Sequence, residues 1–117
     1  MNFKESPEFS KELKKFTKKY KSLPEDINQF KKIVLSIPLG NSKHFNIITK
    51  TENCVILKAR LFCRYLKGNS LRIVYSYNQK SSLIEFIEVY FKGEKENEDK
   101  ERIKQYLKTQ KHTPSSN

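Results

Sequence analysis

Apolar residues are scarce in this chain: they make up 36% of its 117 residues, and no run of about 18 of them occurs. The absence of such a run excludes an ordinary transmembrane helix. The first ten residues, MNFKESPEFS, contain no apolar core of a signal peptide, so we expect a cytoplasmic protein. An apolar content this low for one small domain also suggests that a partner completes part of its surface.

Cysteine and histidine are rare, with two residues of each. Cys54 and Cys63 form no Cys-x-x-Cys pair, so in a reducing compartment they are predicted to be reduced and mostly buried thiols. His44 falls in a predicted loop and His112 in the tail, so we interpret both as surface residues and expect no catalytic histidine pair. The sequence has no metal-ligand cluster, glycine-rich phosphate loop or nucleophile elbow. We therefore expect neither a metal nor a small-molecule cofactor.

Positive charge, in contrast, is abundant: 24 lysines and arginines stand against 13 acidic residues, a net charge of +11. Such a balance favours polyanionic partners and says little about the fold. The distribution is more informative. Residues 51–92, which carry most of the predicted strands, contain seven cations and three acidic residues. Strand positions are few and half of them face a core, so cations there are less easily explained as a solvated surface than lysines on a helix.

Two N-terminal helices are predicted after a short strand at residues 2–5. Ser6 as cap and Pro7 at the first position open one helix, and Ser22 and Glu25 fit a capping box that opens the other. Few residues separate the helices, which favours an antiparallel hairpin. Their apolar stripes are Phe9, Leu13, Phe16 and Tyr20 in the first helix, and Ile27, Phe30 and Val34 in the second.

The rest of the chain reads as strands and one more helix. Residues 38–53 are polar and mixed, and are interpreted as loop. Strands are predicted at about 54–65, 71–78 and 82–92, joined by short turns that make them antiparallel neighbours. A last helix is predicted at about 97–108, with an acidic start that suits a helix N-terminus.

The expected fold class is α+β, with the helical hairpin packed on one face of an antiparallel sheet of three to four strands and a C-terminal helix. We expect one domain over residues 1–110 and a disordered tail at 111–117.

The stretch LKARLFCRYLKG, residues 57–68, alternates between an apolar and a basic set. If the apolar set packs on the helices, the basic set lies on the uncovered face of the sheet. Cations bind phosphates and aromatic rings stack on unpaired bases; the alternative is a solvated face whose cations prevent aggregation. The apolar set is Leu57, Ala59, Leu61 and Cys63; the uncovered face is predicted to carry Lys58, Arg60, Arg64, Arg72 and Lys92, with Phe62 nearby, and the last strand to place Phe86, Glu88, Tyr90 and Lys92 together.

These elements resemble the RelE/ParE superfamily of bacterial toxins, specifically its RelE-like branch. The resemblance spans about residues 2–107 and rests on FSKELKKF, LPEDINQF, LKAR, LRIVYSY and FIEVYFKGEKENED, in that order. It implies the toxin of a type II toxin–antitoxin system. Such a toxin is a metal-independent endonuclease that cleaves mRNA on the ribosome and is silenced by a cognate antitoxin.

The resemblance also implies site residues. Lys58 and Arg60 match two basic positions on the family's first long strand, and Arg72 matches the arginine that holds the scissile phosphate. Lys92 lies where the family has a basic residue after its last long strand, which completes the four candidate catalytic residues. The turn after LKAR is longer than in the family. The candidate RNA-binding residues are Phe62, Arg64, Lys67, Tyr90 and Lys95, and Tyr90 and Tyr106 are candidates for the aromatic residue that the family often places near its C-terminus.

The chemistry follows from the residue types. Like charges disfavour the protonated form of a lysine, so Lys58 beside Arg60 and Arg72 is expected to take the proton of the 2′-hydroxyl. Arginine stays protonated and suits a phosphate clamp. Two alternatives remain open: a non-catalytic gyrase inhibitor like the ParE branch, which the density of sheet cations disfavours, and a basic RNA-binding or ribosome-associated module.

Overall fold

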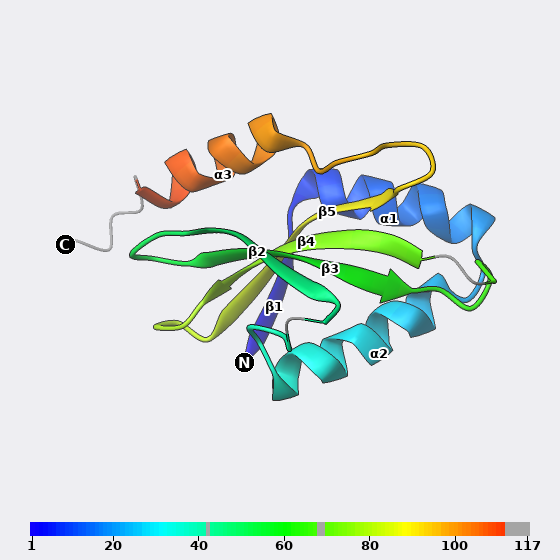
Figure 1. Ribbon diagram of the computed structural model, residues 1–117, viewed down its shortest axis with the longest axis horizontal. Coiled ribbons are helices and arrows are strands. Elements are labelled where there is room, and N and C mark those ends of the chain that lie inside the picture. The colour runs from blue at the N-terminus through cyan, green and yellow to red at the C-terminus, as the bar shows by residue number, and fades with distance from the viewer. Residues whose placement is uncertain (42, 68–69, 112–117) are drawn as a thin grey trace.

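A five-stranded sheet lies between the helical hairpin and the C-terminal helix in the computed structural model, which describes residues 1–41, 43–67 and 70–111 (Figure 1). The strand order is β1–β5–β4–β3–β2, with β1 parallel to β5 and every other pair of neighbours antiparallel. Residues 68 and 69 of the predicted turn and most of the predicted tail lie outside the described residues. The strands are β1 Asn2–Glu5, β2 Phe45–Lys50, β3 Val55–Phe62, β4 Ser70–Asn78 and β5 Leu83–Phe91.

The hairpin consists of α1, Pro7–Lys19, and α2, Leu23–Ser36. The start of α1 is as predicted, because the Ser6 hydroxyl accepts a hydrogen bond from the Phe9 amide at 3.1 Å. The predicted capping box of α2 is wrong. The Ser22 hydroxyl makes no cap hydrogen bond, and instead donates to the Asp26 carboxylate at 2.6 Å. It also accepts a hydrogen bond from the Tyr65 amide in the turn that follows β3.

The larger hydrophobic core fills the space between the hairpin and the sheet. Phe30 of α2 lies at its centre, 4% exposed, and its ring contacts the rings of Phe45, Tyr75 and Phe86. The apolar set of β3 faces this core as predicted, and so do the matching residues of β4. The members from these two strands are Leu57, Ala59, Leu61, Leu71, Ile73 and Tyr75, joined by Cys63 just after β3.

A second core lies on the opposite face, beneath α3, Lys100–Lys111. Ile56, Val74 and Ile87 of the sheet pack there against Ile103, with Tyr106 and Leu107 partly buried alongside. Arg102 fastens the helix by donating to the Glu12 carboxylate at 2.8 and 3.0 Å. The face predicted to be uncovered is therefore covered by α3 over part of its area, and the cations lie on the remainder.

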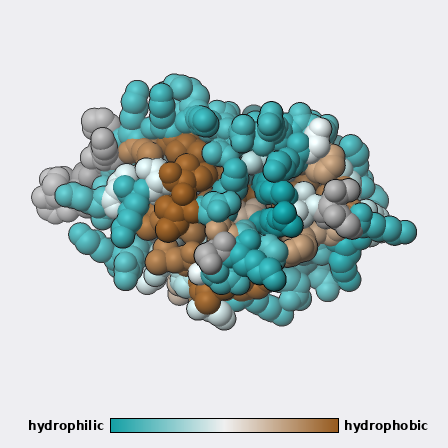
Figure 2. Space-filling model, viewed as in Figure 1, coloured by the Kyte–Doolittle hydropathy of each residue, from teal (hydrophilic) through white to brown (hydrophobic). Residues whose placement is uncertain are grey.

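The interpretation of residues 38–53 as loop is wrong, because residues 45–50 form β2. This strand lies at the edge of the sheet and pairs only with β3, and Phe45 is its one buried residue. An edge strand with so little burial lacks the alternation by which strands are recognised. Ile47 is 59% exposed, and Figure 2 shows a hydrophobic patch over β2 in a largely hydrophilic surface.

A β-bulge corrects the predicted face of β5. Val74 pairs with Glu88 whereas Tyr75 pairs with Phe86, so Ile87 is the extra residue between them. The strand changes phase at this point: Phe86 faces the hairpin core, while Ile87 and Glu88 both face α3. Strict alternation had predicted that Phe86 shares a face with Glu88 and Tyr90. This prediction is wrong, because Phe86 lies on the opposite face.

Replacing Phe30 with alanine should lower the free energy of unfolding by about 3–5 kcal/mol, the usual cost of deleting a buried ring. Urea unfolding followed by circular dichroism measures this. Leu35→Ala is the matched control on the same helix, where the side chain is 48% exposed and the expected cost is below about 1 kcal/mol. Equal losses in the two variants would contradict the position of the core.

Candidate nucleic-acid interface

Two arginines lie directly opposite one another on β3 and β4. Arg60 pairs with Arg72 in the ladder, and Arg72 pairs in turn with Tyr90 of β5. Their side chains line a cavity of about 200 Å³. Arg60 and Arg72 are two of the four candidate catalytic residues. The other two, Lys58 on β3 and Lys92 just beyond β5, line the same cavity. The cavity is lined by Lys43, His44, Asn46, Lys58, Ala59, Arg60, Arg72 and Lys92.

Arg72 is held in place by its own strand. Its guanidinium donates to the Ser70 hydroxyl at 2.7 Å, and its neighbours Leu71 and Ile73 are buried in the hairpin core. Burial, and then the charge of Arg60, lower the pKa of Arg72, whereas the electrostatic interaction with Tyr90 raises it. Arginine remains protonated at any ordinary pH, so the cavity holds a fixed positive charge.

Lys58 is paired with a carboxylate that the sequence analysis did not consider. Its ammonium donates to Glu98 at 2.8 Å, and the Glu98 side chain is only 10% exposed. Burial raises the pKa of the Glu98 carboxyl, but the hydrogen bond from Lys58, a backbone hydrogen bond and the charges of Lys58 and Lys100 together bring it below its ordinary value. The ion pair with Glu98 thus orients the Lys58 side chain, which also lines the cavity.

The segment between β5 and α3 is fastened by a second acidic residue. Glu88, which is completely buried, accepts hydrogen bonds from the Lys95 ammonium and the Asp99 amide. The Lys95 ammonium also lies 5.6 Å from the centre of the Tyr90 ring. These contacts hold the segment that carries Glu98. They therefore position Lys58 indirectly, through its ion pair with Glu98.

Tyr90 lies differently from what stacking on RNA would require, whereas the Lys95 side chain is 42% exposed. The Tyr90 ring is 4% exposed, and so it offers no open face for stacking on a base. Burial, and then the charges of Glu98 and Glu88, raise the pKa of Tyr90 to about 12, although Arg72 lowers it. The neutral phenol lies beside Arg72 beneath the segment that carries Lys95.

The remaining predicted residues lie at the end of β3 and in the turn beyond it, away from α3. The Phe62 ring is 59% exposed. Arg64 is 66% exposed and is paired with Glu25 at 3.2 Å and with Asp26 at 3.5 Å. Lys67 is exposed and lines two depressions together with Arg64. β3 ends at Phe62, earlier than predicted, because the chain turns between Cys63 and Leu66.

His44 is a site residue that the sequence analysis missed. It is half-buried and lines the cavity, its ring meets Phe62 edge-on at 5.4 Å, and its buried Nδ1 has no hydrogen-bond partner in the described part of the chain. The Arg60 amide donates to the His44 carbonyl at 3.0 Å, which places the residue beside β3. Only recognition of β2 as an edge strand would have predicted this neighbour.

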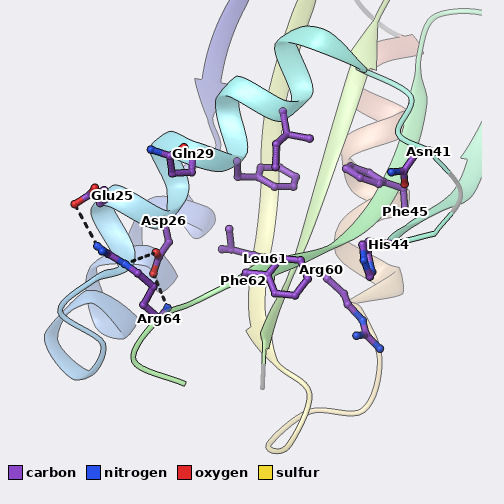
Figure 3. Close-up of a pocket in the computed structure, with 12 residues that line it drawn as sticks. Glu25, Asp26, Gln29, Asn41, His44, Phe45, Arg60, Leu61, Phe62 and Arg64 are labelled. Carbon is purple, nitrogen blue, oxygen red and sulfur yellow. Dashed lines mark hydrogen bonds and ion pairs between the residues drawn. The ribbon is translucent and has the colours of Figure 1, made fainter. Parts of the chain in front are cut away.

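An apolar groove of about 440 Å³ lies on the hairpin side of the same strand end, between α2 and β3. Figure 3 shows Arg64 between Glu25 and Asp26 at one end of the groove, and His44 and Arg60 at the other. Its walls include Phe30, Ile33, Phe45, Leu61 and Phe62. The groove and the basic cavity share His44 and Arg60, so the two surfaces adjoin.

The helical hairpin, the mixed sheet and the C-terminal helix define the RelE-like fold that the sequence pattern predicted. The sheet has five strands and one parallel pair in the described part of the chain, where an antiparallel sheet of three to four strands was predicted. The chain is similar to RelE in the crystal structure of the archaeal RelE–RelB complex from Pyrococcus horikoshii OT3, with a TM-score of 0.60 and 20% sequence identity over 79% of this chain and 94% of that chain. No family model and no curated protein matches the chain. Since a fold hosts several functions, the activity has to be inferred from the site.

None of the helices in the described ranges has the length and apolar character needed to cross a membrane.

Replacing Glu98 with glutamine should destabilise the protein at neutral pH by about 1–3 kcal/mol, the range for a hydrogen bond to a charged group. A carboxyl whose pKa is lowered by folding contributes stability above its unfolded pKa, near 4.5, and the contribution disappears as pH falls through the folded value. The difference between wild type and Glu98→Gln should therefore shrink below pH 4.5.

Urea unfolding at several pH values between about 3 and 7 checks this, because that range brackets the ordinary pKa of a glutamate. Glu96→Gln, an exposed position in the same segment, is the control and should show little effect at any pH. A loss for Glu98→Gln that is the same at both ends of the range would mean that the ion pair with Lys58 does not carry it.

Proposed function

We propose that this chain is a RelE-like toxin that cleaves mRNA on the ribosome. The observation that carries the proposal is the cation-lined cavity, which Arg60 and Arg72 line from paired positions on neighbouring strands. Preorganised charge of this kind stabilises a phosphorane without reorganisation during the reaction. The RelE-like fold supports the proposal, and the resemblance in sequence pattern supplies the ribosome as the place of action.

The reaction is attack of a ribose 2′-oxygen on the adjacent phosphorus, with cleavage of the bond from phosphorus to the 5′-oxygen. The 2′-hydroxyl gives up a proton, and the departing 5′-oxygen receives one. Arg72 and Arg60 would hold the non-bridging phosphate oxygens and offset the charge that builds up on them. Both arginines have the planar fork that suits this contact.

The Glu98 pair alters the role proposed for Lys58. The argument from like charges considered only Arg60 and Arg72, and the direct partner of the ammonium is a carboxylate at 2.8 Å. An ammonium has three N–H donors, and a Lys58 oriented by Glu98 is suited to hydrogen-bond the phosphate or the departing 5′-oxygen rather than to act as the base. His44 also lines the cavity, and it is then the candidate to accept the 2′-hydroxyl proton.

We also propose an antitoxin partner, a small acidic protein that covers the basic face. The similar archaeal RelE is found in a complex with RelB. In this chain the groove between α2 and β3 presents apolar side chains to solvent, among them Ile33 at 45% and Phe62 at 59% exposed. A net charge of +11 makes an acidic partner the complementary one.

Arg72→Ala should reduce single-turnover mRNA cleavage in a programmed ribosome by about 100-fold or more, which corresponds to about 3 kcal/mol for one preorganised contact. Ribosome binding should fall much less, because many other cations share that task. Arg72→Lys should rescue only part of the loss, since lysine lacks the planar fork.

Lys11→Ala, on an exposed position of α1, is the control and should cleave as the wild type does. Full activity of Arg72→Ala with unchanged binding would remove Arg72 from the site. If the wild-type chain binds ribosomes and cuts no mRNA, the protein is an RNA-binding module rather than a nuclease.

The reading frame next to this one should encode a small acidic protein that co-purifies with the chain. Ile33→Asp should weaken that complex at least about tenfold, because it places an unpaired carboxylate in the apolar groove. Isothermal titration calorimetry measures the affinity, and Leu35→Asp on the same helix, outside the groove, is the control. A chain that is stable, monomeric and harmless when expressed alone would count against the antitoxin.

A further inference from the structure

Beyond the cavity, the end of β3 and the turn after it form a line of shallow depressions. The basic cavity shares Arg60 with a depression of about 320 Å³. That depression shares Arg64 and Lys67 with another of about 550 Å³, which reaches Lys21 in the α1–α2 connection. The three hollows are therefore linked through shared side chains. They lead away from α3 and over the turn formed by residues 63–67.

Exposed rings and cations alternate along this line. Phe62 is 59% exposed and Tyr65 is 57% exposed, and they rank among the most exposed large apolar or aromatic side chains in the described part of the chain. Arg60, Arg64 and Lys67 lie between and beside them. A groove of cations with rings set at intervals is what unpaired nucleic acid needs, since phosphates bind the cations and bases stack on the rings.

The turn that carries Arg64 and Tyr65 is held rigidly from below. The Arg64 amide donates to the Asp26 carboxylate at 3.2 Å, and the Tyr65 amide donates to the Ser22 hydroxyl at 3.3 Å. Ser22 and Asp26 are both 7% exposed and are hydrogen-bonded to each other. This buried pair fixes the backbone of the turn on the start of α2, so two exposed side chains project from a fixed base.

Arg64 keeps binding capacity despite its acidic neighbours. Its guanidinium contacts Glu25 through Nη2 and Asp26 through Nε, and a guanidinium has five N–H donors. Asp26 is occupied by the Ser22 hydroxyl and the Arg64 amide as well. The charged side chain is thus oriented by its partners and remains 66% exposed toward the line of depressions.

We propose that this line of depressions, which we name the turn track and define by Lys21, Arg60, Phe62, Arg64, Tyr65 and Lys67, binds single-stranded RNA next to the cavity, with Phe62 and Tyr65 as stacking platforms for bases. The proposal rests on the proposed function only for the position of the scissile phosphate. RNA is favoured as the occupant because the track is cationic and continuous with the basic cavity. Arg60, Phe62 and Arg64 also line the apolar groove, but Lys21, Tyr65 and Lys67 do not.

The test is fluorescence anisotropy of the purified full-length chain with a labelled single-stranded RNA of about ten nucleotides, a length within the usual site sizes. Phe62→Ala and Tyr65→Ala should each weaken binding about tenfold, or about 1.4 kcal/mol. Phe62→Tyr and Tyr65→Phe keep a ring and should bind as the wild type does. Ile47→Ala, 59% exposed on β2 and outside the track, is the control for loss of exposed apolar surface.

A second measurement isolates the cations. Replacing Lys21 and Lys67 together with alanine should reduce the slope of log K against log salt by about 1.4, since each phosphate contact on a single strand contributes about 0.7. The same change at Lys11 and Lys14, exposed on α1, should leave the slope unchanged. Duplex RNA of equal length should compete poorly, because its bases are not free to stack.

Binding within twofold of the wild type in both ring-to-alanine variants would overturn the track, as would equal competition by duplex RNA. Unchanged RNA binding with loss of the acidic partner would assign the surface to a protein instead. The outcome is separable from nuclease activity. If RNA binding depends on the two rings and no mRNA is cleaved on the ribosome, the nuclease is rejected and the turn track is kept. If mRNA is cleaved and RNA binding does not depend on the rings, the turn track is rejected and the nuclease is kept.

Discussion

Two arginines facing each other across neighbouring strands are the constraint around which the site is arranged. Like charges directly opposite in a sheet destabilise it, yet Arg60 and Arg72 occupy paired positions on β3 and β4. The strands hold them there because residues on the other face are buried under the hairpin and Val74 and Ile56 are buried under α3. The burial of two cores therefore offsets a local repulsion, and departures of this kind from local rules are expected at functional sites.

The segment between β5 and α3 supplies the acidic counterpart. Glu98 pairs with Lys58 at 2.8 Å, and the buried Glu88 holds the segment in place through the Asp99 amide. The bulge at Ile87 makes this possible, because it turns Glu88 and Ile87 together toward α3. A strand without the bulge would have directed one of them into the hairpin core, where a carboxylate has no partner.

The sequence was sufficient to predict the helical hairpin, four of the five strands described, including β1 at residues 2–5, and the faces of Leu57, Ala59 and Leu61, because local spacing and burial agree there. It did not reveal β2, whose single buried residue leaves no alternation, or the bulge, which a change of pairing partner produces. The predicted cations at Lys58, Arg60, Arg72 and Lys92 do meet in one cavity. Glu98 and His44 were missed because both reach the site from segments whose positions depend on tertiary contacts.

The proposed RNA and protein surfaces overlap at the end of β3. Arg60, Phe62 and Arg64 line the apolar groove and also belong to the turn track. A partner seated in the groove would cover the Phe62 ring and engage two of the cations that a single strand would need. Occupation by the partner and by RNA would then exclude each other through shared side chains, with no change in the shape of the cavity. Inhibition would need only that the partner bind more tightly than RNA to these three residues.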